Sequence, residues 1–572
     1  MTEHMADDVL PKLHAARSYK GQPPEEQMGY QGTLGDLLNE RAAATPHKRY
    51  LTYYDEADKA TYHSYAEFRD AVHQAASYMA EALGLRPGDR IANMAHNHAD
   101  TVVIYFAAWA LGVTVVPVNV GEDDERVAFI MHNAECKAAF VRPEYLARVV
   151  QARGEVPTLE TVVQVGGESL EPGADRHFGQ EKGEYAGFFT PPQPFDNTQE
   201  AIIVYTSGTT GAPKGVLLNQ YNLLVDAQGV LAWHQMTAEQ HTMCVLPIHH
   251  VNGVLVTLIT PVLFGGSTVL NRTFSPRWFW QRVEDENIQV VSVVPTLLAY
   301  LLEAENKQQD FKQYDLSGFR HFICGAGPLT VQLGQEFEDT FHLPIMHGYG
   351  LSETTCYSCF LPLDLTEAQH KQWMRDYGYP SIGVPIIPNE MAIHDPEGNI
   401  LPPGPDHKGE IVIRGHNIMQ GYFRRPDANA DCFAHGWFRS GDEGFMVEDE
   451  QGRPFYFITG RIKELIIRGG VNYSPFEIDE VLTAIPGVKI GLAVGFPNKY
   501  YGEEVGAYIV LEEGASVSEE EIMRQAREKL PFSKSPKVIV FGDVVPVTST
   551  GKYQRLKLES LFAAHENSQF RE

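Results

Sequence analysis

The stretch Ile203-Val-Tyr-Thr-Ser-Gly-Thr-Thr-Gly-Ala-Pro-Lys-Gly-Val216 places hydroxyl groups, glycines and one lysine in a tight turn after a strand. The apolar, β-branched run at residues 201–205 predicts that strand to be buried. Backbone N–H groups of the turn can form a concave anion site, and glycine lets the backbone approach a ligand closely. We therefore expect a phosphate-binding loop formed by Thr206, Ser207, Gly208, Thr209, Thr210, Gly211 and Lys214.

The residues after the lysine distinguish this loop from the Walker A type. In a Walker A loop, the Gly-Lys-Ser/Thr end opens directly into a helix. Here residues 215–218 are predicted as a second strand, so the loop joins two strands and the next helix begins near Asn219. The alternative is an ordinary polar turn, but such a turn requires neither four hydroxyls nor a lysine.

Composition limits the kinds of partner. The chain has 572 residues, too many for one compact domain. Its 74 acidic and 46 basic residues give a formal charge of −28, which opposes attraction to nucleic acid and favours a protein that binds small molecules. The six cysteines are too sparse for a disulfide framework, residues 1–22 show no export signal, and no apolar run reaches the roughly 18 residues of a membrane span. We therefore expect a cytoplasmic protein without a membrane span.

Alternating helical and apolar strand segments predict an α/β fold. We expect a large N-terminal domain of several layers, made of two α/β subdomains and a smaller β region. Residues 157–197, rich in Gly, Pro and acidic side chains, are predicted as a long surface connection. The predicted domains are residues 1–460, a hinge at 461–465, and a small mobile α+β domain at 466–572.

Two further loops carry residues suited to a nucleotide and its metal ion. In His347-Gly-Tyr-Gly-Leu-Ser-Glu-Thr-Thr355, flanking glycines leave the Tyr349 ring free to lie against a flat base, and Glu353 supplies a hard oxygen ligand for Mg²⁺. In Trp437-Phe-Arg-Ser-Gly-Asp-Glu-Gly444, Asp442 lies in a glycine-bounded turn that suits two ribose hydroxyls. Each loop alone is also compatible with a structural turn, so the interpretation depends on their occurring together.

With the phosphate loop, these segments resemble the signatures of the adenylate-forming superfamily, in its acyl-CoA synthetase branch. The resemblance continues, in the family's order, through residues 247–253, 322–328, 455–470 and 546–552, and it covers nearly the whole chain. Two departures stand out. His249 replaces an aromatic residue of the family, and residues 361–380 are longer than the usual spacing.

The resemblance implies a role for particular residues of this chain. It assigns catalysis to Lys552, Lys214, Glu353 and His250, and the hinge to Lys463. It assigns ATP and AMP binding to the phosphate loop and to Gly325, Ala326, Tyr349, Thr354, Asp442, Arg461 and Lys552. Magnesium is assigned to Thr206 and Glu353, the coenzyme A channel to Gly469 and Gly470, and the acyl pocket to His250, Val251, Asn252, Gly253, Gly325 and Gly327.

The implied activity is ATP-dependent joining of a carboxylic acid to coenzyme A. The acid first forms an acyl-AMP with release of pyrophosphate, and the small domain then rotates so that the thiol can attack and AMP leaves. ATP, Mg²⁺ and coenzyme A are the implied cofactors.

Several alternatives stay open. A stand-alone acyl-AMP ligase that loads a separate carrier protein is the main one, and a non-catalytic nucleotide sensor is disfavoured because Lys552 and Glu353 are both present. The sequence leaves the oligomeric state open, a homodimer included. Because no basic residue clearly pairs with a second substrate charge, we expect a fatty or aromatic monocarboxylic acid.

Overall fold

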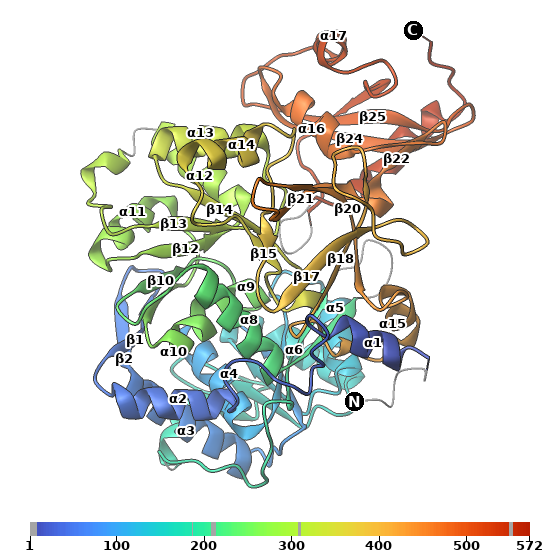
Figure 1. Cartoon of the computed structure of the whole chain (residues 1–572). Coiled ribbons are helices and arrows are strands. Elements are labelled where there is room, and N and C mark those ends of the chain that lie inside the picture. Colours follow the sequence, from blue (N-terminus) through green and yellow to red (C-terminus); the bar gives the residue numbers. More distant parts are fainter. Residues whose placement is uncertain (1–7, 186, 207–212, 307–309, 548–552, 572) are drawn as a thin grey trace.

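A computed structural model describes residues 8–185, 187–206, 213–306, 310–547 and 553–571. Figure 1 shows a large body that contains most of the chain, with the C-terminal segment in orange and red at one end. Within these ranges the strands form four sheets, two large ones and two smaller ones. The predicted α/β class, with a large N-terminal part and a smaller C-terminal part, is confirmed.

The first large sheet has eight strands. They are β3 (Arg90–Met94), β4 (Thr114–Pro117), β5 (Ala138–Val141), β6 (Thr161–Gln164), β7 (Arg176–His177), β8 (Glu200–Thr206), β9 (Lys214–Asn219) and β19 (Gly421–Tyr422). Their order is β19-β9-β8-β4-β3-β5-β6-β7. Strands β4, β3, β5 and β6 run parallel, whereas β8 and β9 form an antiparallel hairpin. The two strands predicted on either side of the phosphate loop are therefore confirmed.

Strand β6 corrects one sequence-based prediction. Residues 157–197 were expected to form a surface connection, but β6 pairs in parallel with β5 and buries Val162 and Val163 completely. Strand β7 and the short helix α7 (Phe178–Glu181) follow in the same segment. The prediction was wrong because a four-residue β-branched strand is a weak signal inside a Gly- and Pro-rich stretch.

The second large sheet has nine strands. They are β1 (Arg49–Tyr54), β2 (Ala60–Ser64), β10 (His241–Cys244), β11 (Ser267–Asn271), β12 (Val290–Val293), β13 (His321–Cys324), β14 (Ile345–Tyr349), β15 (Cys359–Phe360) and β16 (Val384–Pro385). Their order is β16-β15-β14-β13-β12-β10-β11-β1-β2. The strands from β1 through β14 along this order run parallel, so the loops after β13 and β14 open at the same edge.

Helices connect these strands. They are α1 (Leu10–Ala16), α2 (Leu34–Ala44), α3 (Tyr65–Glu81), α4 (Ala99–Leu111), α5 (Asp124–Asn133), α6 (Pro143–Ala152), α8 (Gln220–Trp233), α9 (Val251–Val254), α10 (Thr260–Phe264), α11 (Pro276–Asp285), α12 (Pro295–Asn306), α13 (Val331–Phe341), α14 (Glu367–Arg375) and α15 (Pro426–Cys432). A π-helical turn at Leu255–Ile259 joins α9 to α10. Helix α8 begins where the sequence predicted, because the Asn219 side chain caps it by accepting a hydrogen bond from the backbone N–H of Asn222.

Alternating side chains give each large sheet two buried faces. On β5, Ala138 and Phe140 join one core cluster, whereas Ala139 and Val141 join another that contains residues of α5 and α6. The cluster with Phe140 also contains Leu270 of β11 and residues of α3, α4, α8 and α10. These helices therefore lie between the two sheets, and further helices cover the outer faces.

The third sheet connects the large body to the C-terminal part. It contains β17 (Asn389–His394), β18 (Gly409–Gly415), β20 (Phe438–Glu448) and β21 (Pro454–Arg461), in the order β17-β18-β20-β21. A 3-10 turn at Ile462–Glu464 follows β21 directly, and the next strand already belongs to the fourth sheet. Figure 1 shows β20 and β21 immediately below the C-terminal sheet.

The fourth sheet forms the core of the C-terminal part. Its strands are β22 (Ile466–Arg468), β23 (Val471–Tyr473), β24 (Val488–Asn498), β25 (Gly502–Leu511) and β26 (Val538–Phe541). Helices α16 (Pro475–Thr483) and α17 (Glu519–Lys529) supply residues to the core on one face, and a 3-10 helix at Arg555–His565 does so on the other. On β24, Ala493 faces the first cluster and Leu492 and Val494 face the second, so this part has a core of its own.

Residues 361–380 pack against the base of this connection. The Trp373 ring of α14 stacks on Phe455 of β21, with ring centroids 3.8 Å apart, and Tyr377 stacks on Trp373 at 5.3 Å. Helix α14 is also joined to α13, because His370 contacts Glu338 at 2.7 Å. The longer segment thus supports the strand that leads into the C-terminal part.

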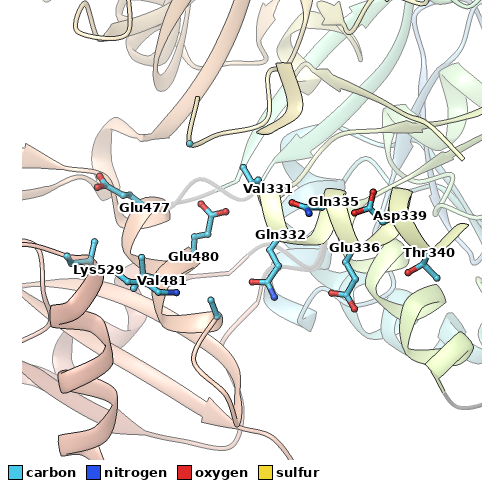
Figure 2. A pocket seen from close by; sticks show the side chains of 13 residues that line it. Val331, Gln332, Gln335, Glu336, Asp339, Thr340, Glu477, Glu480, Val481 and Lys529 are labelled. Carbon is cyan, nitrogen blue, oxygen red and sulfur yellow. The ribbon is translucent and has the colours of Figure 1, made fainter. Parts of the chain in front are cut away.

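A cavity of about 770 Å³ lies between α13 and the C-terminal part. Figure 2 shows side chains from α13 on one side and from α16 on the other, with Glu480 pointing toward Val331 and Gln332. Burial raises the pKa of the Glu480 carboxyl, and the backbone N–H groups of Val331 and Gln332 partly offset that rise by favouring its charged form. This contact joins the two parts of the molecule.

Candidate active site

The predicted phosphate loop lies between two paired strands, β8 and β9, whose ends the structure describes. Thr206 ends β8 and lies opposite Lys214, and its hydroxyl donates a 3.4 Å hydrogen bond to the Lys214 carbonyl. Five of the predicted loop residues, Ser207, Gly208, Thr209, Thr210 and Gly211, lie outside the described residues, as does Lys552. Their predicted roles stay predictions.

Lys214 and Glu353 meet at a common neighbour, Tyr422. The Lys214 ammonium lies 4.6 Å from the centre of the Tyr422 ring, a cation–π contact. The Tyr422 hydroxyl donates a 2.7 Å hydrogen bond to Glu353 Oε1. Burial, with the nearby Glu353 carboxylate, raises the pKa of Tyr422, so this phenol stays a proton donor. The tertiary structure thus brings together a lysine and a carboxylate that are 139 positions apart in the sequence.

Tyr422 was missed by reasoning from the sequence. It lies on β19, a two-residue strand that pairs with β9 opposite Val216. A lone tyrosine after Gly421 carries no signal of a site, and only its pairing with β9 places it beside Lys214.

A second group of side chains surrounds Asp442. The Tyr349 hydroxyl donates a 2.6 Å hydrogen bond to Asp442 Oδ2, and Arg461 Nε lies 2.8 Å from Asp442 Oδ1. Asp442 and Arg461 are directly opposite in the β20–β21 pair, which fixes this contact. The Asp442 carboxylate is the main cause of the raised pKa of Arg461, and Glu353 also contributes. Arg461 therefore links this group electrostatically to Glu353.

The turn after β13 lies against the same region. A side chain at Gly325 would meet the Tyr357 ring at 2.7 Å and the Gly348 carbonyl at 2.8 Å, so only glycine fits there. Ala326 adopts a φ of +61°, in the left-handed region. Gly327 follows in the same turn. Residues expected at the adenine thus lie next to the β14 segment that carries Tyr349.

Thr354 lies close to the site but is already engaged. Its hydroxyl donates a 3.2 Å hydrogen bond to the Leu351 carbonyl and accepts one of 3.0 Å from the Leu351 N–H. Thr354 is fully buried. Its side chain therefore closes the turn that contains Glu353, and its predicted contact with nucleotide stays a prediction.

The predicted acyl-pocket residues lie at the start of α9. The rings of His249 and His250 are 4.4 Å apart, and burial lowers the pKa of His249, which keeps that ring neutral. Val251 and Gly253 are buried next to them. Asn252 donates a 3.0 Å hydrogen bond to the Tyr357 hydroxyl and accepts one of 2.7 Å from Ser292.

The predicted hinge and channel residues lie after β21. Lys463 is exposed in the 3-10 turn at Ile462–Glu464. Gly469 and Gly470 form the exposed turn between β22 and β23, with φ values of +59° and +81°. Because a positive φ favours glycine, both positions depend on this residue type.

The described arrangement is that of an α/β enzyme with a hairpin of two paired strands ending at Thr206 and Lys214, and with a separate small C-terminal part. Comparisons with known proteins are more specific. Residues 38–423 match the AMP-binding enzyme family and residues 477–552 match the AMP-binding enzyme C-terminal domain. The chain belongs to this family, in its branch of acid–CoA ligases that form AMP.

Individual relatives span almost the whole chain. A sulfoacetate–CoA ligase from Cupriavidus necator is 33% identical, over 92% of this chain and 97% of the relative. An oxalate–CoA ligase from Arabidopsis thaliana is 31% identical, over 91% of this chain and 97% of the relative. The crystal structure of ATP-bound MatB from Rhodopseudomonas palustris has a TM-score of 0.81 at 26% identity and covers 93% of this chain and 99% of its own.

The family assignment confirms the predicted enzyme class and its use of ATP and coenzyme A. Among the residues that the structure describes, none of the helices combines the length and apolar character needed to span a bilayer.

Proposed function

We propose that the protein joins a short carboxylic acid with a second polar group to coenzyme A, through an acyl-AMP formed with Mg²⁺ and ATP. The observation that supports the site most directly is the placement of Lys214 and Glu353 on either side of Tyr422. Lys214 ends the loop that we propose to hold the triphosphate, so this placement brings Glu353 close to that loop.

Glu353 has the character expected of a metal ligand. The residue is 8% exposed, and its carboxylate accepts a hydrogen bond from a neutral phenol and forms no salt bridge among the described residues. Binding of a cation stabilises the negative charge of a buried carboxylate that has no paired cation. Mg²⁺ prefers hard oxygen ligands of this kind. Thr206 is the proposed second ligand. When bound, Mg²⁺ would neutralise charge on the phosphate oxygens.

The residues of the chain then have separate tasks. In the first step a carboxylate oxygen of the acid attacks the α-phosphorus and pyrophosphate leaves, so negative charge shifts toward the leaving oxygens. Lys214 and Arg461 would stabilise that charge, and Asp442 would hold the ribose. Lys552 is proposed to bridge the acid and the α-phosphate. In the second step the thiol of coenzyme A attacks the acyl carbon and AMP leaves.

Polar groups around the proposed acyl pocket favour a short acid over a fatty one. The Tyr357 ring fills the space beside Gly325. Its hydroxyl accepts a hydrogen bond from Asn252, which in turn accepts one from Ser292. A pocket for a fatty acid is lined mainly by apolar side chains. Two relatives are named for sulfoacetate and oxalate, acids that carry a second anionic group. The expectation of a fatty or aromatic acid, which rested on a missing basic residue, stays open as the alternative to this proposal.

The domain organisation supports a rotation between the two steps. The proposed large domain ends at residue 460, the hinge spans 461–465, and the small domain covers 466–572. The end of β21 at Arg461 and the separate core that begins with β22 agree with these limits. Coenzyme A is the proposed acceptor, with Gly469 and Gly470 beside its path and Lys463 as pivot.

The test measures pyrophosphate release and thioester formation with ATP, Mg²⁺ and coenzyme A, for acids of increasing length with and without a second polar group. Release and thioester formation with short polar acids, lost in Lys552→Ala, is the expected result. Release without thioester would indicate a carrier protein as acceptor. Preference for long apolar acids would overturn the proposed acid class, and no release with any acid would overturn the function.

A further inference from the structure

Asp226 is a buried carboxyl group that none of these steps uses. It lies on α8, is fully buried, and forms no salt bridge in the described part of the chain. Burial raises the pKa of Asp226 to about 8. Burying a carboxylate without a paired cation costs free energy of folding. We therefore expect Asp226 to have a structural or functional role in the core.

Both oxygens of Asp226 face N–H donors. Asn417 Nδ2 donates to Oδ1 at 2.9 Å, and the backbone N–H of Tyr357 donates to Oδ2 at 3.3 Å. The orientation of the Asn417 amide is fixed independently, since Nδ2 also donates to the Thr354 carbonyl at 2.9 Å. In Asp226→Asn, the side-chain N–H₂ group would face one of these two donors, Asn417 Nδ2 or the Tyr357 N–H. Because two donors cannot pair, that hydrogen bond would be lost.

Asn417 connects Asp226 to the turn that carries Glu353. Besides its bond to Thr354, the Asn417 carbonyl accepts a 2.6 Å hydrogen bond from the Thr355 hydroxyl. Two residues later, the N–H of Met419 donates to the Glu353 carbonyl at 2.8 Å. Thr355 has a φ of +66°, an unfavourable value for a β-branched residue that its surroundings must hold in place. The turn after Glu353 is thus fixed from the 417–419 segment.

We propose that Asp226 is a positioning residue: through Asn417 it holds the Glu353 turn, and so sets the place of the Glu353 carboxylate relative to Tyr422 and Lys214. This inference rests on the proposed function of Glu353. Some residues position a metal ligand without binding the metal themselves. Substitution of such a residue typically lowers metal affinity or activity by about 10- to 100-fold. In this proposal Asp226 acts through Asn417 and does not itself bind substrate or nucleotide.

The experiment compares Asp226→Asn and Asn417→Ala with the control Tyr221→Phe. Tyr221 is also on α8 and its hydroxyl bonds to His416 at 2.6 Å, so the control removes a buried contact of the same helix but none of the side-chain hydrogen bonds of Asn417. The readouts are kcat and the KM values for ATP and for the acid in pyrophosphate release, and the Mg²⁺ concentration that gives half of the ATP-induced rise in Tm.

We expect both test variants to lower kcat by about tenfold or more and to raise the half-saturating Mg²⁺ concentration, while KM for the acid stays unchanged. The control should keep wild-type values. A folded Asp226→Asn protein with wild-type kcat and Mg²⁺ requirement would overturn the inference. If Asp226→Asn does not fold, wild-type values in Asn417→Ala would overturn it equally. Inactivity of the wild type would instead count against the proposed function.

Discussion

The Tyr349 hydroxyl donates a 2.6 Å hydrogen bond to Asp442, so the residue expected under the base is tied directly to the residue expected at the ribose. Arg461 occupies the other oxygen of the same carboxylate at 2.8 Å. A carboxylate has about four lone-pair sites, so Asp442 keeps capacity for ribose hydroxyls while both neighbours fix its orientation.

Removal of the Tyr349 hydroxyl should weaken ATP binding. Tyr349→Phe keeps the ring but leaves Asp442 with one partner fewer, and a hydrogen bond to a charged group is worth about 1.5–3 kcal/mol. We expect kcat/KM for ATP to fall about tenfold or more, mainly through KM. Tyr456→Phe is the matched control, because it removes a buried hydroxyl of β21 that bonds to the Met391 carbonyl instead. Equal values for the two variants would contradict this role.

Glu353→Gln should impair the first half-reaction. The amide keeps the size of the side chain but loses the charge expected to hold Mg²⁺. We expect pyrophosphate release to slow by about 100-fold or more, the scale of one lost electrostatic contact in a transition state. Glu338→Gln is the control, since Glu338 is similarly buried but pairs with His370 on α14. Normal Mg²⁺ dependence in Glu353→Gln would contradict the assignment.

Glu480 should stabilise the observed orientation of the C-terminal part. Its carboxylate points toward Val331 and Gln332 at the positive end of α13 (Figure 2), and the N–H groups there favour its charged form, an interaction worth about 0.3–2 kcal/mol. In Glu480→Ala we expect faster hydrogen exchange at these two amides. Glu477→Ala is the control, because Glu477 pairs with Lys534 inside the C-terminal part at 2.7 Å. Unchanged exchange in Glu480→Ala would show that other contacts determine the orientation.

Asp226 should make stability depend on pH. Burial raises its pKa from 3.8 to about 8, so the folded state binds this proton more tightly than the unfolded state. The resulting stabilisation is complete below pH 3.8 and is lost as the pH rises toward 8. The free energy of unfolding of the wild type should therefore fall relative to Asp226→Asn across this range, as measured by urea denaturation. Parallel curves would contradict a raised pKa.

The sequence by itself determined the order of the chemistry along the chain. Hydroxyls and glycines between two strands predicted the hairpin loop before Lys214, and the structure confirms both strands. The motifs at Tyr349, Glu353 and Asp442 could be located because each is a local turn pattern that a short stretch of residues encodes, while the roles assigned to them stay predictions. The division into a large N-terminal part and a smaller C-terminal part could be predicted as well. The helices and strands of both parts follow from hydrophobic periodicity, which is a local property of the sequence.

Only the tertiary structure decided which of these groups meet. Tyr422 lies beside Lys214 because β19 pairs with β9, and Asp226 lies behind the Glu353 turn because α8 packs against the 416–418 segment. Neither residue belongs to a readable motif. Contacts of this kind depend on strand register and helix packing between distant segments, which the local pattern of one sequence does not specify. The same limit explains why β6, a short strand held by its neighbour β5, was missed.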